Sequence, residues 1–156
     1  MIGRWAFGTA ALMLAPSVQA HVTLSPAQGV AGARQVYVVR MPNERRVDTV
    51  ALDLQIPAAL RVTGLQQAPG WTLVIDRDAT GAIVAVHWTG ALPPDQYVEF
   101  GLMAVNPATA AELRLSARQT YANGEVVAWN GEVGSRTPAP RVTIAAVAAP
   151  MDHSGH

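Results

Sequence analysis

The sequence predicts an all-β domain, a single antiparallel β-sandwich of the immunoglobulin-like kind. Two observations support this fold class. Short segments in which apolar and polar residues alternate recur between turn signals, and no segment carries a convincing amphipathic helical pattern. Seven or more short strands at this spacing are typical of an antiparallel sandwich.

Alternation of apolar and polar residues marks the expected strands. In Val50–Ile56 every second side chain is strongly apolar, as in a half-buried strand, and the run 113–121 repeats this pattern. Asp78–Gly81 and Asn123-Gly124 are turn signals that separate such segments. The other expected strands, in chain order, are 35–41, 71–76, 82–89, 97–105, 125–130 and 141–147.

The composition excludes several classes of function. The 11 basic residues, all arginine, balance 11 acidic residues without any basic run, so nucleic acid is not an expected partner. Cysteine is absent, which excludes disulfides and thiolate metal sites. Charged or polar residues interrupt every apolar run after residue 20, so we expect no membrane span in the mature protein.

Residues 1–20 have the organisation of a secretory signal peptide. Arg4 supplies a positive charge, 6–15 is a short and largely apolar run, and small residues occupy the positions that a signal peptidase reads before the bond after Ala20. We therefore expect cleavage after Ala20, export to the periplasm and a folded domain over 21–147.

Cleavage at this bond would make His21 the mature N-terminus. The free amine and the imidazole Nδ1 of one terminal histidine can close a six-membered chelate ring on a metal, which an internal histidine cannot do. Nitrogen donors in this geometry suit Cu(II), which leads the divalent metals in affinity and prefers tetragonal sites. The alternative is a histidine that follows the cleavage site by chance.

The segment 148–156 lacks a core pattern, and we expect it to be a flexible tail. Met151, His153 and His156 lie in it. Thioether and imidazole groups on such a tail can capture copper weakly in either oxidation state. The alternative is a tail whose histidines are incidental.

A hairpin at Asn123-Gly124 allows the faces of its two strands to be predicted. A two-residue turn would pair Arg118 with Trp129 and would place this indole on the polar face of the sheet. There it could stack on the Arg118 guanidinium or shield a site made by the N-terminus. A slip of one residue in the register would reverse the assignment.

Two further polar side chains are candidates because of their phase in a strand. Glu99 falls on the face opposite the apolar set of its strand, where it is either simply solvated or a third donor to Cu(II). His87 is interpreted as a partly buried histidine with satisfied partners, unless it approaches His21 and completes a two-histidine brace. Trp71 and Trp88 are expected in the core.

The chain resembles the YcnI-like family of exported copper-binding proteins over nearly all of 21–130. Each matching fragment is weak by itself, but their order and spacing are specific. The fragments are His21-Val22-Thr23-Leu24-Ser25-Pro26, Met41-Pro42-Asn43-Glu44, Pro69-Gly70-Trp71, Trp88-Thr89-Gly90, Tyr97-Val98-Glu99-Phe100 and the run from Gln119 to Trp129.

The resemblance implies a β-sandwich whose mature N-terminal His21 binds Cu(II) through its amine and Nδ1. It implies a carboxylate ligand, assigned to Glu99 with Glu44 as the second choice, and a tryptophan beside the site, assigned to Trp129. The chain departs from the expected pattern by carrying His87 before the Trp-Thr-Gly triplet.

We therefore expect a periplasmic copper chaperone or scavenger, and not an enzyme. Its partners would be the copper ion and another periplasmic or membrane copper-handling protein. One alternative is a copper monooxygenase acting on polysaccharide, which normally needs a second histidine that only His87 could supply from the fold. A metal-free adhesion or assembly sandwich is the other.

Overall fold

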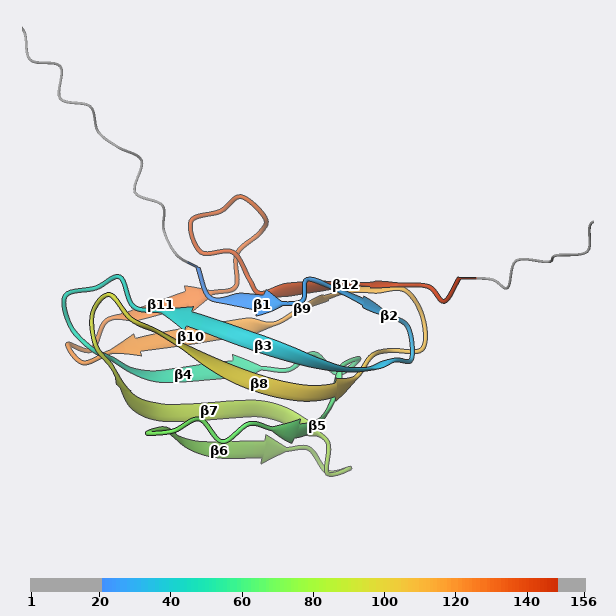
Figure 1. Cartoon of the computed structure of the whole chain (residues 1–156), viewed down its shortest axis with the longest axis horizontal. Coiled ribbons are helices and arrows are strands. Elements are labelled where there is room, and N and C mark those ends of the chain that lie inside the picture. Colours follow the sequence, from blue (N-terminus) through green and yellow to red (C-terminus); the bar gives the residue numbers. More distant parts are fainter. Residues whose placement is uncertain (1–20, 149–156) are drawn as a thin grey trace, which may run out of the picture.

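The computed structural model describes residues 21–148, and every regular element in this range is a β-strand. Two sheets face each other, and the core lies between them (Figure 1). The first sheet has the order β1 (Thr23–Ser25), β3 (Arg34–Pro42), β8 (Tyr97–Val105), β5 (Arg61–Leu65). The second has the order β11 (Val126–Trp129), β10 (Ser116–Tyr121), β4 (Thr49–Gln55), β7 (Ile83–Leu92), β6 (Thr72–Arg77). The predicted β-sandwich is confirmed.

A third, small sheet has the order β2 (Gln28–Val30), β12 (Arg141–Ala145), β9 (Ala111–Arg114). In this small sheet β12 runs parallel to β2 and antiparallel to β9. No helix long and apolar enough to cross a membrane occurs in the described range.

Aromatic side chains fill the centre of the core. The Trp88 and Phe100 rings stack with their centroids 4.5 Å apart, and the Trp71 ring meets the edge of Phe100 at 5.3 Å. Trp71 and Trp88 are both buried, which confirms their predicted place. Offset and edge-to-face contacts of this kind add about 0.5–1.5 kcal/mol per pair beyond the burial of area.

The run 113–121 is not one strand, contrary to the prediction. It divides into β9 and β10, which belong to different sheets, and between them the Leu115 amide donates to the Pro140 carbonyl. The apolar side chains at Leu113, Leu115 and Ala117 nevertheless alternate into the core across the break. The alternation of apolar and polar residues therefore predicted the faces correctly, but it could not show where the chain passes from one sheet to the other.

Three short strands have no counterpart among the predicted ones. β1 and β2 have three residues each, too few for an alternation to be visible. In β5 the register shifts between Val62 and Gly64, and this bulge interrupts the two-residue period.

The hairpin between β10 and β11 has a register that differs by one residue from the prediction. The Tyr121 amide donates to the Glu125 carbonyl, which leaves three residues in the loop, and Gly124 adopts a φ of 87°. This is the three-residue loop that ends in a glycine bulge. Trp129 consequently pairs with Ala117 and not with Arg118. The predicted polar-face position of Trp129 is therefore wrong: the indole points inward and is only 6% exposed.

Candidate metal site at the N-terminal end of the sandwich

Strand β1 fixes the position of His21. Thr23 and Leu24 pair with Arg40 and Val39 of β3, and the side chains of Val22 and Leu24 are buried in the core. His21 immediately precedes this anchored segment. Its imidazole meets the Trp129 ring edge to face, with the ring centroids 5.6 Å apart and an angle of 60° between the ring planes. Figure 1 shows the start of β1 beside β11, the strand that ends at Trp129.

A buried glutamine holds the indole in place. The Nε1–H group of Trp129 donates to Oε1 of Gln119 at 3.1 Å. The amide nitrogen of Gln119 in turn donates to the Pro42 carbonyl at 2.8 Å and to the Thr49 hydroxyl at 2.9 Å. Gln119 is fully buried, so each of these bonds is made away from water. The ring that His21 touches therefore has a fixed orientation.

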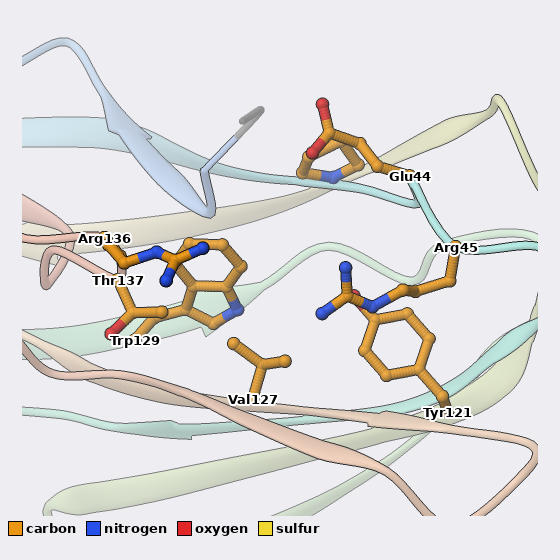
Figure 2. A pocket seen from close by; sticks show the side chains of 8 residues that line it. Glu44, Arg45, Tyr121, Val127, Trp129, Arg136 and Thr137 are labelled. Atoms are coloured by element: carbon orange, nitrogen blue, oxygen red, sulfur yellow. The ribbon is translucent and has the colours of Figure 1, made fainter. Parts of the chain in front are cut away.

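An open cavity of about 260 Å³ lies beside this indole (Figure 2). Strands β3, β10 and β11, the turn after β3 and the loop after β11 supply its walls. The residues that line it are Pro42, Glu44, Arg45, Tyr121, Val127, Trp129, Arg136 and Thr137. The cavity thus combines one carboxylate, two guanidinium groups and two aromatic rings.

The turn that carries Glu44 is held by Asn43. The Asn43 side chain is 1% exposed and donates to the carbonyls of Val47 and Leu92 at 2.9 and 2.8 Å, while its oxygen accepts from the Arg45 amide at 2.9 Å. All the hydrogen-bonding groups of this side chain are used in bracing the backbone. The exposed side chain of Glu44 therefore projects from a well-fixed turn beside the cavity.

The two arginines of the cavity differ in their partners. Arg45 binds Oε1 of Glu125 through Nη2 at 2.7 Å and Nε at 3.2 Å, and its guanidinium lies 5.5 Å from the centre of the Tyr121 ring. The hydrogen bonds that Arg45 donates to the Glu125 carboxylate raise the pKa of Arg45 further, and burial raises the pKa of Tyr121. Arg136 is exposed and has no hydrogen-bond or ion-pair partner among residues 21–148.

Glu99 occupies a different place. It lies on the outer face of β8, as its phase predicted, and its Oε1 accepts from Nη2 and Nε of Arg40 at 2.7 and 2.9 Å. Because Arg40 pairs with Thr23, Glu99 is two strand spacings, about 10 Å, from β1. It does not line the cavity beside Trp129. Its role as a ligand stays a prediction, whereas Glu44 is the carboxylate that lines this cavity.

His87 is not brought to His21. It lies on the outer face of β7, with Nδ1 2.7 Å from Asp53 Oδ1 and Nε2 2.9 Å from Asp76 Oδ2. These two carboxylates raise the pKa of His87, because each favours the charged imidazolium. The pairing of β7 with β4, and of β4 with β10 and β11, places His87 about three strand spacings, or 14 Å, from Ala128.

Side chains alone do not make a metal cluster here. No group of three or more His, Cys, Asp or Glu side chains that could hold a metal ion occurs between residues 21 and 148. A chelate at a terminal histidine uses a main-chain amine as one donor, so it does not depend on such a group. Met151, His153 and His156, the candidates in the tail, lie outside the described residues.

Sequence reasoning missed the residues that support this site. Gln119 shares the inward phase of Ala117 and Tyr121, and a polar residue at such a position is a signal that a buried hydrogen bond is needed. Asn43, in the Pro-Asn-Glu motif, is a second buried polar residue whose side chain needs hydrogen-bond partners. No local pattern pointed to Arg136, because the loop after β11 reaches the cavity only through the tertiary fold.

The fold and the site together define an immunoglobulin-like β-sandwich with a histidine and an indole in contact at one end. The chain belongs to the family described as a domain of unknown function (DUF1775), whose model matches residues 21–144. The family resemblance inferred from the sequence fragments is thereby confirmed.

Comparisons with individual proteins agree with this family and with this fold. The chain is 28% identical to the copper-binding protein CutI of Bacillus subtilis (strain 168), over 95% of this chain and 73% of that one. An uncharacterized protein from Nocardia farcinica with an immunoglobulin-like fold matches with a TM-score of 0.67 and 30% identity, over 80% of this chain and 98% of that one. A non-cellulosomal cohesin from Archaeoglobus fulgidus matches with a TM-score of 0.51 and 15% identity, over 82% and 91% of the chains, which reflects the fold alone.

Proposed function

We propose that this is an exported copper-binding protein of the periplasm that holds Cu(II) through the terminal amine and Nδ1 of His21 and the carboxylate of Glu44. The observation that carries the proposal is the contact of His21 with Trp129, because this indole lines the same cavity as Glu44. The printed name of the Bacillus relative, a copper-binding protein, supports the choice of metal.

The donor set fits Cu(II). The two nitrogens of His21 and the Glu44 carboxylate would supply the N,O donors that this ion prefers. The indole has a supporting role, since its N–H group is a donor only and is already committed to Gln119. The buried Trp129 ring would instead provide a rigid apolar wall beside the metal.

Chaperoning or scavenging suits this arrangement better than catalysis. The rival monooxygenase chemistry normally needs a second histidine on the metal, and both ring nitrogens of His87 are engaged by carboxylates on another part of the molecule. A metal-free adhesion or assembly sandwich, in which His21 is incidental, gives no reason for the packing of His21, Trp129 and Gln119.

Titration of protein that begins at His21 with Cu(II), against a competing chelator, tests the proposal. We expect one-to-one binding that weakens as the pH falls, because metal must displace protons from an amine with an ordinary pKa near 7.7–8.0 and from an imidazole near 6.5. His21→Ala should lose affinity on the order of 100-fold or more, whereas His87→Ala should bind as the parent does. Equal losses in both variants would contradict the assignment.

A further inference from the structure

The outer face of the sheet β1-β3-β8-β5 carries an exposed apolar pair. Val36 of β3 and Met103 of β8 are partners in the register and are 55% and 59% exposed. Both strands lie in the interior of this sheet, between the edge strands β1 and β5 (Figure 1). The Met103 side chain lies against Gly64 of β5, where a Cβ atom would lie 3.3 Å from its sulfur. Single exposed apolar residues are common, but a registered pair in the middle of a sheet face is a feature of contact surfaces.

A cavity and two arginines adjoin this pair. Arg34 and Arg61 pair with Val105 from its two sides, so their Cα atoms lie two strand spacings, about 10 Å, apart. Both arginines are exposed, and neither has a hydrogen-bond or ion-pair partner among residues 21–148. The cavity has a volume of about 140 Å³ and is lined by Arg34, Gln35, Val36, Thr63, Met103 and Ala104.

This region, the arginine–methionine face, consists of Arg34, Val36, Arg61, Thr63 and Met103. It is positively charged, although the whole chain has no formal net charge. The other charged strand residues on the outside of the same sheet are Arg40 and Glu99, which neutralise each other at 2.7 Å. Two unpaired positive charges therefore stand beside the apolar pair.

We propose that the arginine–methionine face docks an acidic segment of a partner protein. A carboxylate of the partner would accept hydrogen bonds from the Arg61 or Arg34 guanidinium, whose planar fork matches a carboxylate. An apolar side chain of the partner would enter the cavity beside Met103, whose flexible thioether adapts to such a contact. Arginine and methionine are both enriched at protein interfaces.

The inference goes beyond copper binding and holds whether or not His21 binds metal. Arg40 is the residue of β3 that pairs with Thr23 of β1, and Arg34 lies six residues away from it along the strand, about 20 Å. A partner on the arginine–methionine face would therefore leave the surroundings of His21 open.

A protein partner fits this face better than a membrane surface. Segments that recognise anionic lipids typically carry clusters of about four to eight basic residues, whereas only two unpaired arginines stand on this face within the described range. A bilayer also presents no side chain of fixed position to the cavity beside Met103.

Nuclear magnetic resonance of protein that begins at His21, with its methionine methyl groups labelled with ¹³C, tests this inference. The probe is the peptide acetyl-Glu-Thr-Leu-Thr-Glu-amide. In an extended strand its glutamates lie about 7 Å from the leucine, as Val105 does from Met103 along β8. We expect the Met103 methyl resonance to shift saturably while that of Met41, which is fully buried, stays in place. The same peptide with lysine for glutamate should have no effect.

Substitution of the arginines identifies the contact. Arg61→Gln should raise the peptide concentration at half-saturation about tenfold, as expected for lost charge-assisted hydrogen bonds, and Arg34→Gln is a second, independent variant. Arg118→Gln is the matched control, because Arg118 is exposed on β10 in the other sheet. An unchanged Met41 resonance shows that each variant keeps the parent fold.

Three results would overturn the inference: a Met103 resonance that ignores the peptide, arginine variants that both respond as the parent does, or a lysine peptide that produces the same shift. A fourth is a Met103 shift with phosphatidylglycerol vesicles at a lower concentration of acidic groups than the peptide needs. That outcome would assign the face to a membrane surface and reject a protein partner.

Discussion

The two histidines between residues 21 and 148 lie in opposite surroundings. His87 stands in the middle of a sheet face, and each of its ring nitrogens is within 2.9 Å of a carboxylate oxygen. His21 stands at the edge of the sandwich, where its ring contacts an aromatic side chain beside an open cavity. Burial alone does not distinguish them, since both are of intermediate exposure.

The difference shows that the partner of an imidazole decides its role. His87 links β4, which carries Asp53, to the edge strand β6, which carries Asp76, and the two carboxylates raise its pKa. The Trp129 ring forms no ion pair with a nitrogen of His21, so these nitrogens stay open to the proposed metal. The predictions below test this contrast, from the largest expected effect to the smallest.

Glu44, which lines the same cavity as Trp129, should matter more to Cu(II) binding than Glu99, which does not line it. Glu44→Gln should weaken Cu(II) binding about 10- to 100-fold, a loss typical of an altered ligand environment. Glu99→Gln should change it less than about threefold, because Glu99 pairs with Arg40 outside the cavity. Competitive titration of both variants measures the two effects, and a larger loss in Glu99→Gln would restore Glu99 as the ligand.

The hydrogen bond between the Trp129 indole and Gln119 should contribute to the free energy of unfolding. Trp129→Phe removes the donor to Gln119 and leaves its Oε1 unpaired in a fully buried place. We expect the free energy of unfolding to fall by about 1–3 kcal/mol, the cost of an unsatisfied buried polar group. Urea denaturation measures it. Stability equal to that of the parent would show that the Gln119 bond does not hold the ring.

The His87 link should make stability depend on pH. Its pKa is raised in the folded state by Asp53 and Asp76, so its contribution is complete below the unfolded pKa near 6.5 and is lost as the pH rises through the folded pKa. The cross-strand neighbours of this link are Arg118, beside Asp53, and Val74, beside His87. The difference in melting temperature between the parent and His87→Gln should therefore shrink from pH 6 to pH 9, and a constant difference would contradict the link.

The smallest effect on Cu(II) affinity is expected for a substitution of His87. His87→Gln should leave Cu(II) affinity within about twofold, because His87 lies about 14 Å from the strand that carries Trp129. The same titration used for Glu44→Gln measures it. A loss of tenfold or more would mean that the two regions are coupled.

The sequence predicted the fold class because burial in a sandwich repeats every two residues. The phase of Val98, Phe100 and Leu102 correctly placed Glu99 on the outer face. Trp71 and Trp88 were also correctly predicted to lie in the core. Trp129 was misplaced because its face depends on the length of one loop, and three residues instead of two reverse it.

The candidate site was predictable only in part. His21 followed from the expected cleavage site and the chemistry of a terminal histidine, and the family resemblance brought Trp129 beside it. The preference for Glu44 over Glu99 could not be obtained from phase, because it depends on the turn that Asn43 braces after β3. Arg136 comes from a loop whose position only the tertiary structure gives.

Cu(II) titration followed by electron paramagnetic resonance, on protein that begins at His21 and on the same protein with one glycine added before His21, tests the central claim most directly. The account predicts a one-to-one tetragonal signal in the first protein. In the second, whose amine has become an amide at this position, binding should be on the order of 100-fold weaker or more. Unchanged binding in the extended protein would contradict the claim that the N-terminal histidine chelates the metal.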